Sequence, residues 1–139
     1  MQLLENPDKW IRKAIYEPLA ILNIPVFEVR QGQNANNPYV LITTQSKSIQ
    51  KGNKCAYNWD SNVTIEIIQR IVKTGNTASK VAINDIENQI LSVINNLVID
   101  NFVLLNTDYN SNSLTTNGID ENIERIIINL NLKLYEYTN

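Results

Sequence analysis

Residues 123–137 read IERIIINLNLKLYEY, and this stretch decides the fold class. Isoleucine or leucine occupies every second position from 126 to 134, with mostly polar residues between them. Because successive side chains of a strand point to opposite faces of its sheet, the alternation predicts one long strand with an apolar and a polar face. Such a strand is typical of an antiparallel sheet that packs only one face against a core.

Two segments have apolar residues at helical spacing instead. Residues 78–97 carry alanine or isoleucine at every fourth position, which predicts the strongest helix of the chain. Residues 7–22 show a similar period after Asn6, a residue type favoured at helix N-caps. Pro18 removes one helical hydrogen bond, so this helix either ends near Glu17 or continues with a kink.

Shorter runs of β-branched and aromatic residues predict the other strands, at residues 25–29, 39–44, 63–71 and 102–107. The polar residues 45–58 form an extended loop or a protruding hairpin arm, and residues 108–122 form a polar loop. The order is helix, strand, strand, strand, helix, strand, strand. The sequence therefore predicts a single α+β domain over residues 1–139, a mainly antiparallel sheet of about five strands with two helices on one face.

The composition argues against most catalytic and metal-binding sites. The 139 residues include no histidine, one cysteine, 12 basic and 14 acidic residues, with a formal net charge of −2. Histidine is the residue most used as a general base and as a ligand of transition metals, and Cys55 has no histidine to activate it. A net charge near zero gives no overall attraction to nucleic acid or anionic lipid. We therefore expect no enzymatic activity, no cofactor and no metal site.

One segment comes close to a calcium-binding loop. Asp108, Asn110 and Asn112 place side-chain oxygens at the first, third and fifth positions of such a loop. The sixth position is Ser113 where glycine is required, and the twelfth is Ile119 where glutamate is required. We interpret the segment as an ordinary polar loop.

The chain is rich in asparagine and isoleucine, with 22 and 20 residues respectively. Both residues have AT-rich codons, and the asparagines are scattered through the chain rather than grouped in one tract. We interpret this bias as a property of an AT-rich genome. The N-terminus lacks the basic and apolar segments of a signal peptide, and no apolar run is long enough for a membrane span, so we expect a soluble protein that stays in the cell.

The candidate interface residues lie in and just after the polar stretch 45–58, in the predicted loop 108–122 and in the terminal strand. They are Lys47, Lys51, Lys54, Tyr57, Trp59, Tyr109 and Tyr135. The three lysines form a basic patch that is either a contact arm for an acidic partner or phosphate backbone, or a solvated loop. Tyr57 and Trp59 favour the contact, because aromatic residues just outside a strand are enriched at protein interfaces.

The order of elements resembles that of phage tail terminator or tail-completion proteins. The segments that carry the resemblance are residues 11–29, the run Asn37-Pro38-Tyr39-Val40-Leu41-Ile42, residues 63–71 and the helix after Gly75. In that family an antiparallel sheet packs against helices, and copies assemble as a ring at the end of the tail tube or in the neck. The resemblance implies a structural virion protein with interfaces built from strand edges and the long loop, here residues 45–60 and the terminal strand.

The resemblance also implies partners and a location. The chain would bind copies of itself in a homo-oligomeric ring, and other tail or neck proteins, in a virion assembled in the host cytoplasm. DNA would pass through the ring with at most non-specific contact, and no membrane would be involved. An exposed terminal strand would then be covered by a neighbour instead of inviting aggregation. The alternative is a small intracellular protein-binding or regulatory module of the same fold.

Overall fold

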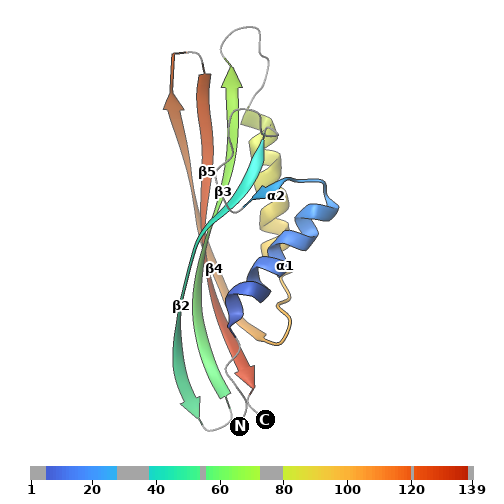
Figure 1. Cartoon of the computed structure of the whole chain (residues 1–139), viewed down its shortest axis with the longest axis vertical. Helices are drawn as coiled ribbons and strands as arrows, with labels where there is room; N and C mark the ends of the chain where they lie inside the picture. Colours follow the sequence, from blue (N-terminus) through green and yellow to red (C-terminus); the bar gives the residue numbers. More distant parts are fainter. Residues whose placement is uncertain (1–5, 28–37, 54–55, 73–79, 120, 138–139) are drawn as a thin grey trace.

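The computed structural model describes residues 6–27, 38–53, 56–72, 80–119 and 121–137. Its elements are α1 (Pro7–Ile21), β1 (Val26–Phe27), β2 (Tyr39–Asn53), β3 (Ala56–Val72), α2 (Lys80–Asn95), β4 (Val103–Asn117) and β5 (Glu121–Tyr137). This order confirms the one predicted from the sequence. The four long strands run side by side along the long axis of the molecule, and they are strongly twisted (Figure 1).

The five strands form one mixed sheet with the order β1-β2-β3-β5-β4. β1 is parallel to β2, whereas the β2–β3, β3–β5 and β5–β4 pairs are antiparallel. β3 and β5 form the centre of the sheet, paired from Ala56 opposite Tyr137 to Val72 opposite Glu121. The α+β class and the mainly antiparallel pairing agree with the prediction, and the parallel β1 is an addition to it.

The polar residues 45–58 belong to a hairpin, which is one of the two structures expected for them. β2 runs to Asn53, and Ser48 within it pairs with Asp60 of β3. β5 flanks β3 over the same length, so the hairpin is part of the sheet and does not protrude as an arm. Backbone hydrogen bonds to both β2 and β5 hold this part of β3 in the sheet, although its sequence is polar.

The loop predicted over residues 108–122 is wrong, because β4 continues to Asn117 and β5 begins at Glu121. In the turn between them, the Gly118 N–H donates to the Glu121 carbonyl oxygen at 2.9 Å. A Cβ at Gly118 would lie 2.7 Å from that oxygen, so the turn requires glycine. Along β4, Asp108 and Asn110 follow one another on one face at a spacing of roughly 7 Å, which differs from the converging oxygens of a calcium loop.

α1 begins as predicted, with the Asn6 side chain accepting a hydrogen bond from the backbone N–H of Asp8 at 3.0 Å. Pro18 lies inside the helix, which continues to Ile21, so of the two outcomes expected at the proline the continuation is the one observed. The turn after the proline contributes Leu19, which is fully buried. This burial offsets the hydrogen bond that the proline removes.

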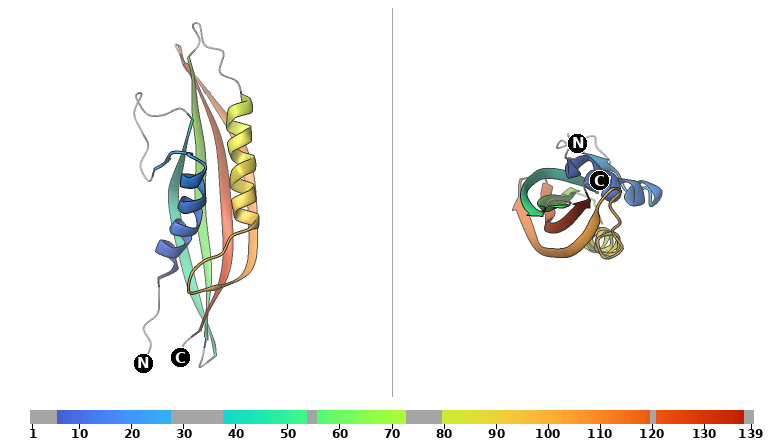
Figure 2. Two further views of the ribbon diagram at one scale, coloured as in Figure 1. Left: turned by 90° about the vertical axis from the view of Figure 1, so that its right-hand side faces the viewer. Right: turned by 90° about the horizontal axis from the view of Figure 1, so that it is seen from below.

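Both helices pack on the same face of the sheet, as predicted (Figure 2). The core between the two layers consists mainly of isoleucine, leucine and valine. It contains Ile11, Ile15 and Leu19 of α1, Ile83, Ile90 and Ile94 of α2, Val40 and Ile42 of β2, Val63, Ile65 and Ile67 of β3, and Ile126, Ile128, Leu130, Leu132 and Leu134 of β5. Alternate residues of each strand therefore face the helices. Within the described ranges, neither helix has the length and hydropathy needed to cross a bilayer.

We call the other side of the sheet the open face. At one end it carries a second apolar cluster, in which Tyr39, Leu41 and Ile68 are buried with Phe27 and Ile123 against them. The rings of Phe27 and Tyr39 meet edge to face with centroids 5.8 Å apart. This cluster anchors the short β1 against β2, since aromatic pairs of this geometry add to the stability gained from burial.

Candidate assembly surfaces

Among the described residues, the sheet ends on both sides in a strand with an unpaired outer edge. β4 is the last strand on one side, and in this part of the chain it pairs with β5 alone. On the other side, β1 covers β2 only at Val40 and Leu41, so residues 42–53 pair with β3 alone in the described part of the chain. Each edge presents a row of backbone N–H and C=O groups to which a further strand can add.

The terminal strand is not one of these edges. β5 lies between β3 and β4, so the prediction that the terminal strand offers an exposed edge is wrong. The alternation of apolar and polar residues reports which face of a strand is buried and carries no information about which strands flank it. The exposed edges belong to β2 and to β4, and the sequence assigned most of β4 to a loop.

β4 lacks the features that commonly protect an edge strand. Its one charged residue is Asp108, and it contains neither lysine nor proline. Leu104 packs against the core, whereas the other four large apolar side chains are between 43% and 59% exposed; they are Val103, Leu105, Tyr109 and Leu114. An irregularity in register between Leu104 and Asn106 affects only the start of the strand. The rest is a long, regular edge with little to prevent pairing.

The open edge of β2 lies beside α1 and is held by it. Lys47 Nζ lies 2.7 Å from Asp8 Oδ2. Gln45 Nε2 donates to the Asp8 carbonyl oxygen at 3.2 Å, and Gln45 Oε1 accepts a hydrogen bond from Arg12 Nε. A cavity of about 600 Å³ lies between α1, β1 and Ile42, and α1 lines it with Tyr16, three basic residues (Lys9, Arg12 and Lys13) and two acidic ones (Asp8 and Glu17). This edge therefore combines unpaired backbone with a flank that has a small excess of basic residues.

Asparagine side chains gather on the open face of the sheet. Because cross-strand partners share a face, the register places seven asparagines there: Asn58, Asn62, Asn106, Asn110, Asn112, Asn129 and Asn131. Asn131 Nδ2 donates to Asp60 Oδ1 and Asn62 Oδ1 at 2.7 and 2.8 Å, and Asn129 Nδ2 donates to Asn110 Oδ1 at 3.2 Å. Asparagines scattered along the sequence thus gather on one face, where four of them form two hydrogen-bonded pairs, whatever the codon bias of the gene.

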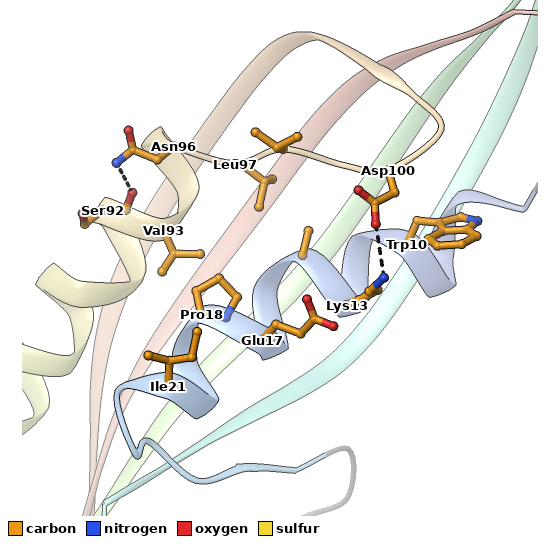
Figure 3. Close-up of a pocket in the computed structure, with 12 residues that line it drawn as sticks. Trp10, Lys13, Glu17, Pro18, Ile21, Ser92, Val93, Asn96, Leu97 and Asp100 are labelled. Carbon is orange, nitrogen blue, oxygen red and sulfur yellow. Dashed lines mark hydrogen bonds and ion pairs between the residues drawn. The ribbon is translucent and has the colours of Figure 1, made fainter.

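A cavity of about 440 Å³ separates the two helices (Figure 3). Its apolar lining comes from α1 and from the end of α2 with the residues after it: Trp10, Ala14, Pro18, Ile21, Val93, Leu97 and Val98. The Lys13 Nζ–Asp100 Oδ2 ion pair, at 3.2 Å, lies at one side, and both side chains are about half exposed. Such a pair contributes little to stability.

The ionisable residues that line this cavity are Lys13, Glu17 and Asp100, of which Lys13 and Asp100 pair with each other. Across the described ranges, no three cysteine or acidic side chains converge as a metal site would require.

Two of the candidate aromatic residues lie inside β3. Trp59 is 8% exposed and belongs to the core, so its predicted position just outside a strand is wrong. Its Nε1–H donates to Glu136 Oε2 at 2.9 Å, and this hydrogen bond is buried. Tyr57 is half-buried and pairs with Glu136 across the β3–β5 ladder. The Trp59 indole is therefore buried within its own chain and is not exposed as an interface residue.

The other candidate residues are spread over both faces. Lys47 is engaged with Asp8, Lys51 pairs with Tyr57 along the backbone, and Lys54 lies outside the described residues. Tyr109 is exposed on the helix-facing side of β4, whereas Tyr135 is half-buried on the open face. The candidate residues whose side chains the structure describes do not form one site, and the interface roles of all seven stay predictions. The sequence interpretation missed the open edge of β4. The signal that could have indicated it is the low charge of this 15-residue segment, which contains a single charged residue.

Comparison with known proteins yields one finding, and it concerns the fold. No protein-family model matches the sequence, and no curated protein matches it. Among solved structures, this chain is similar to a chain of the virion of a native gene transfer agent particle, with a TM-score of 0.58 over 90% of this chain and 92% of that one. The two chains share a fold. Their sequences are 9% identical, so the likeness concerns the fold alone.

Proposed function

We propose that this protein is a structural subunit of a phage-like virion and forms a homo-oligomeric ring at the end of the tail or at the head–tail junction. The observation that carries the proposal is the fold shared with a chain of a gene transfer agent virion over nearly the full length of both chains. The order of elements supports it, because that order resembles the tail terminator proteins.

The surfaces described above suit a protein that works by assembly. A subunit in a ring has neighbours that can cover the open edges of β2 and β4. Other tail or neck proteins would contact its remaining surface, and its place would be in the virion. On the amide-rich open face, acidic residues balance the basic ones, which suits at most non-specific contact with passing DNA; the acidic residues are Asp60, Glu66, Asp108 and Glu121, and the basic ones are Arg70, Arg125 and Lys133.

Deletion of the gene tests the proposal. Particles made without the protein should appear in electron micrographs as separate heads and tails, and the intact chain supplied from a plasmid should restore joined particles. Gold-labelled antibody against the protein should mark one end of the tail. Labelling along the whole tail would contradict the ring. Normal particles, with the protein found only in the host cytosol, would favour the binding module instead.

A further inference from the structure

We propose that β4 of one copy pairs antiparallel with the open edge of β2 in the next copy, so that neighbouring copies continue one sheet. The proposal rests on the proposed function for its setting in a ring. The interface itself is argued from two features of this chain, the long open edges on opposite sides of the sheet.

Strand direction favours this pairing. β2, β3, β5 and β4 are neighbours in that order and each pair is antiparallel, so β2 and β4 run in opposite directions. Copies related by rotation about an axis close to the strand direction keep the same orientation. β4 of one copy then meets β2 of the next in the antiparallel sense, which continues the pattern already present in the sheet.

The register across the sheet identifies the residues that would meet. Through β3 and β5, Gln50 of β2 is level with Val103 of β4, and Thr44 is level with Asn110. When neighbouring copies are not shifted relative to each other along the rotation axis, residues 44–50 of one copy therefore lie opposite residues 103–110 of the next. On the open face Ser48 would face Asn106, and Ser46 would face Asp108; all four are exposed.

The charges beside the two edges are complementary. On the helix-facing side of β4, Glu87 of α2 accepts a hydrogen bond from Ser111 Oγ, whereas Asp108 lies on the open face. On the same helix-facing side, beside the β2 edge, α1 presents Lys9 and Arg12 around the cavity that it forms with β1, together with the acidic Asp8 and Glu17. Opposite charges across an interface favour the correct partner and orientation.

Both edges are used only when the pairing is head to tail. A two-fold dimer formed through β4 alone would cover that edge and leave residues 42–53 of β2 unpaired in both copies. A head-to-tail contact repeats from copy to copy and closes as a ring when the rotation allows. A second copy of this chain is therefore the occupant that matches both edges.

Cysteine cross-linking tests the interface. In a Cys55→Ser background, Ser46→Cys or Ser48→Cys is combined with Asn106→Cys or Asp108→Cys, and the four combinations cover a register shift of two residues. Opposed residues on paired strands have Cβ atoms about 4.5–5.5 Å apart, within reach of a disulfide after small movements. Within one chain the two positions are three strand spacings apart, about 14 Å, which prevents an internal link.

The expected result is a ladder of linked species after oxidation for at least one double variant, and no linked species for the single variants. The control pair Ser48→Cys with Asn88→Cys, which is exposed on α2, should not link. Linkage in the Asn106→Cys single variant would indicate a two-fold contact and overturn the proposal. Absence of linkage both in concentrated protein and in particles would also overturn it.

The two proposals fail separately in these experiments. Protein that is present in virions but never cross-linked would contradict the β4–β2 interface and leave the virion role standing. Linked ladders from a protein that is absent from virions would support the interface and contradict the virion role.

Discussion

A buried hydrogen bond joins the side chains of Trp59 in β3 and Glu136 near the C-terminal end of β5. Trp59 is 8% exposed and Glu136 is 4% exposed, and the indole N–H donates to Oε2 at 2.9 Å. A buried carboxylate needs donors, because leaving a buried polar group without one costs about 1–3 kcal/mol. The hydrogen bond from Trp59 therefore lowers the free-energy cost of burying the Glu136 carboxylate.

Trp59→Phe should lower the free energy of unfolding by about 1–3 kcal/mol, because it removes the donor and part of the core volume. Urea unfolding measures this as a lower midpoint at unchanged slope. Tyr109→Phe is the control, since its exposed hydroxyl should change stability by less than about 0.5 kcal/mol. Equal stability of Trp59→Phe and the parent chain would show that the hydrogen bond does not stabilise the fold.

Some contacts of single residues were beyond sequence reasoning. Lys47 was predicted as a basic contact residue, but its ammonium group pairs with Asp8, 39 positions earlier, at 2.7 Å. Nothing in the polar stretch signals that partner, because the pair exists only once α1 packs beside β2. The N-cap at Asn6 was predictable, since its partner lies two residues away.

At the scale of elements, α1 is a helix with a proline in its interior. An interior proline removes one helical hydrogen bond and costs roughly 3 kcal/mol relative to alanine. Tertiary contacts compensate, since Ile15 and Leu19 on either side of Pro18 are fully buried. The sequence shows that Pro18 interrupts a helical pattern. It does not show whether the helix continues past the proline, because that depends on packing against the sheet.

Pro18→Ala should raise the free energy of unfolding by about 1–3 kcal/mol, because the new N–H can donate to the Ala14 carbonyl oxygen. Thermal unfolding followed by circular dichroism measures the change. Ala20→Gly, at an exposed helical position, should lower stability by about 1 kcal/mol and shows the sensitivity of the assay. A destabilised Pro18→Ala variant would mean that contacts of the proline ring in the inter-helix cavity outweigh the regained hydrogen bond.

The order of elements was predictable, while the lengths of three strands were not. β5 has the clear alternation of a half-buried strand, and its predicted range nearly matches Glu121–Tyr137. β2, β3 and β4 extend well beyond their apolar segments into polar sequence. In those extensions the backbone pairs with neighbouring strands, so the information lies in the neighbours and not in the local sequence.

For the whole molecule, assembly should make thermal stability depend on protein concentration. If folded copies bind each other, a tenfold increase in concentration adds about 1.4 kcal/mol per site, or about 5 °C in Tm for a chain of this size. Tyr109→Lys places a charge on the exposed edge strand and should remove this dependence. Asn88→Lys on α2 should keep it. Equal concentration dependence in both variants would place the contact elsewhere than β4.

The face on which the asparagines gather was invisible in the sequence for a related reason. Asn62, Asn110 and Asn131 are far apart along the chain, and only the strand register brings them level. The sequence interpretation in terms of codons explains how many asparagines the chain has. It does not explain why seven of them lie on the side of the sheet that is away from the helices.

The continuous pairing of β3 with β5 has a mechanical consequence. Every residue of β3, from Ala56 to Val72, has a partner in β5, and the two strands run along the long axis of the molecule (Figure 1). A force applied along that axis acts on all of these backbone hydrogen bonds in shear, so they must break together. A force across the sheet would open them one after another. The protein should therefore resist tension along its length far better than tension across its width.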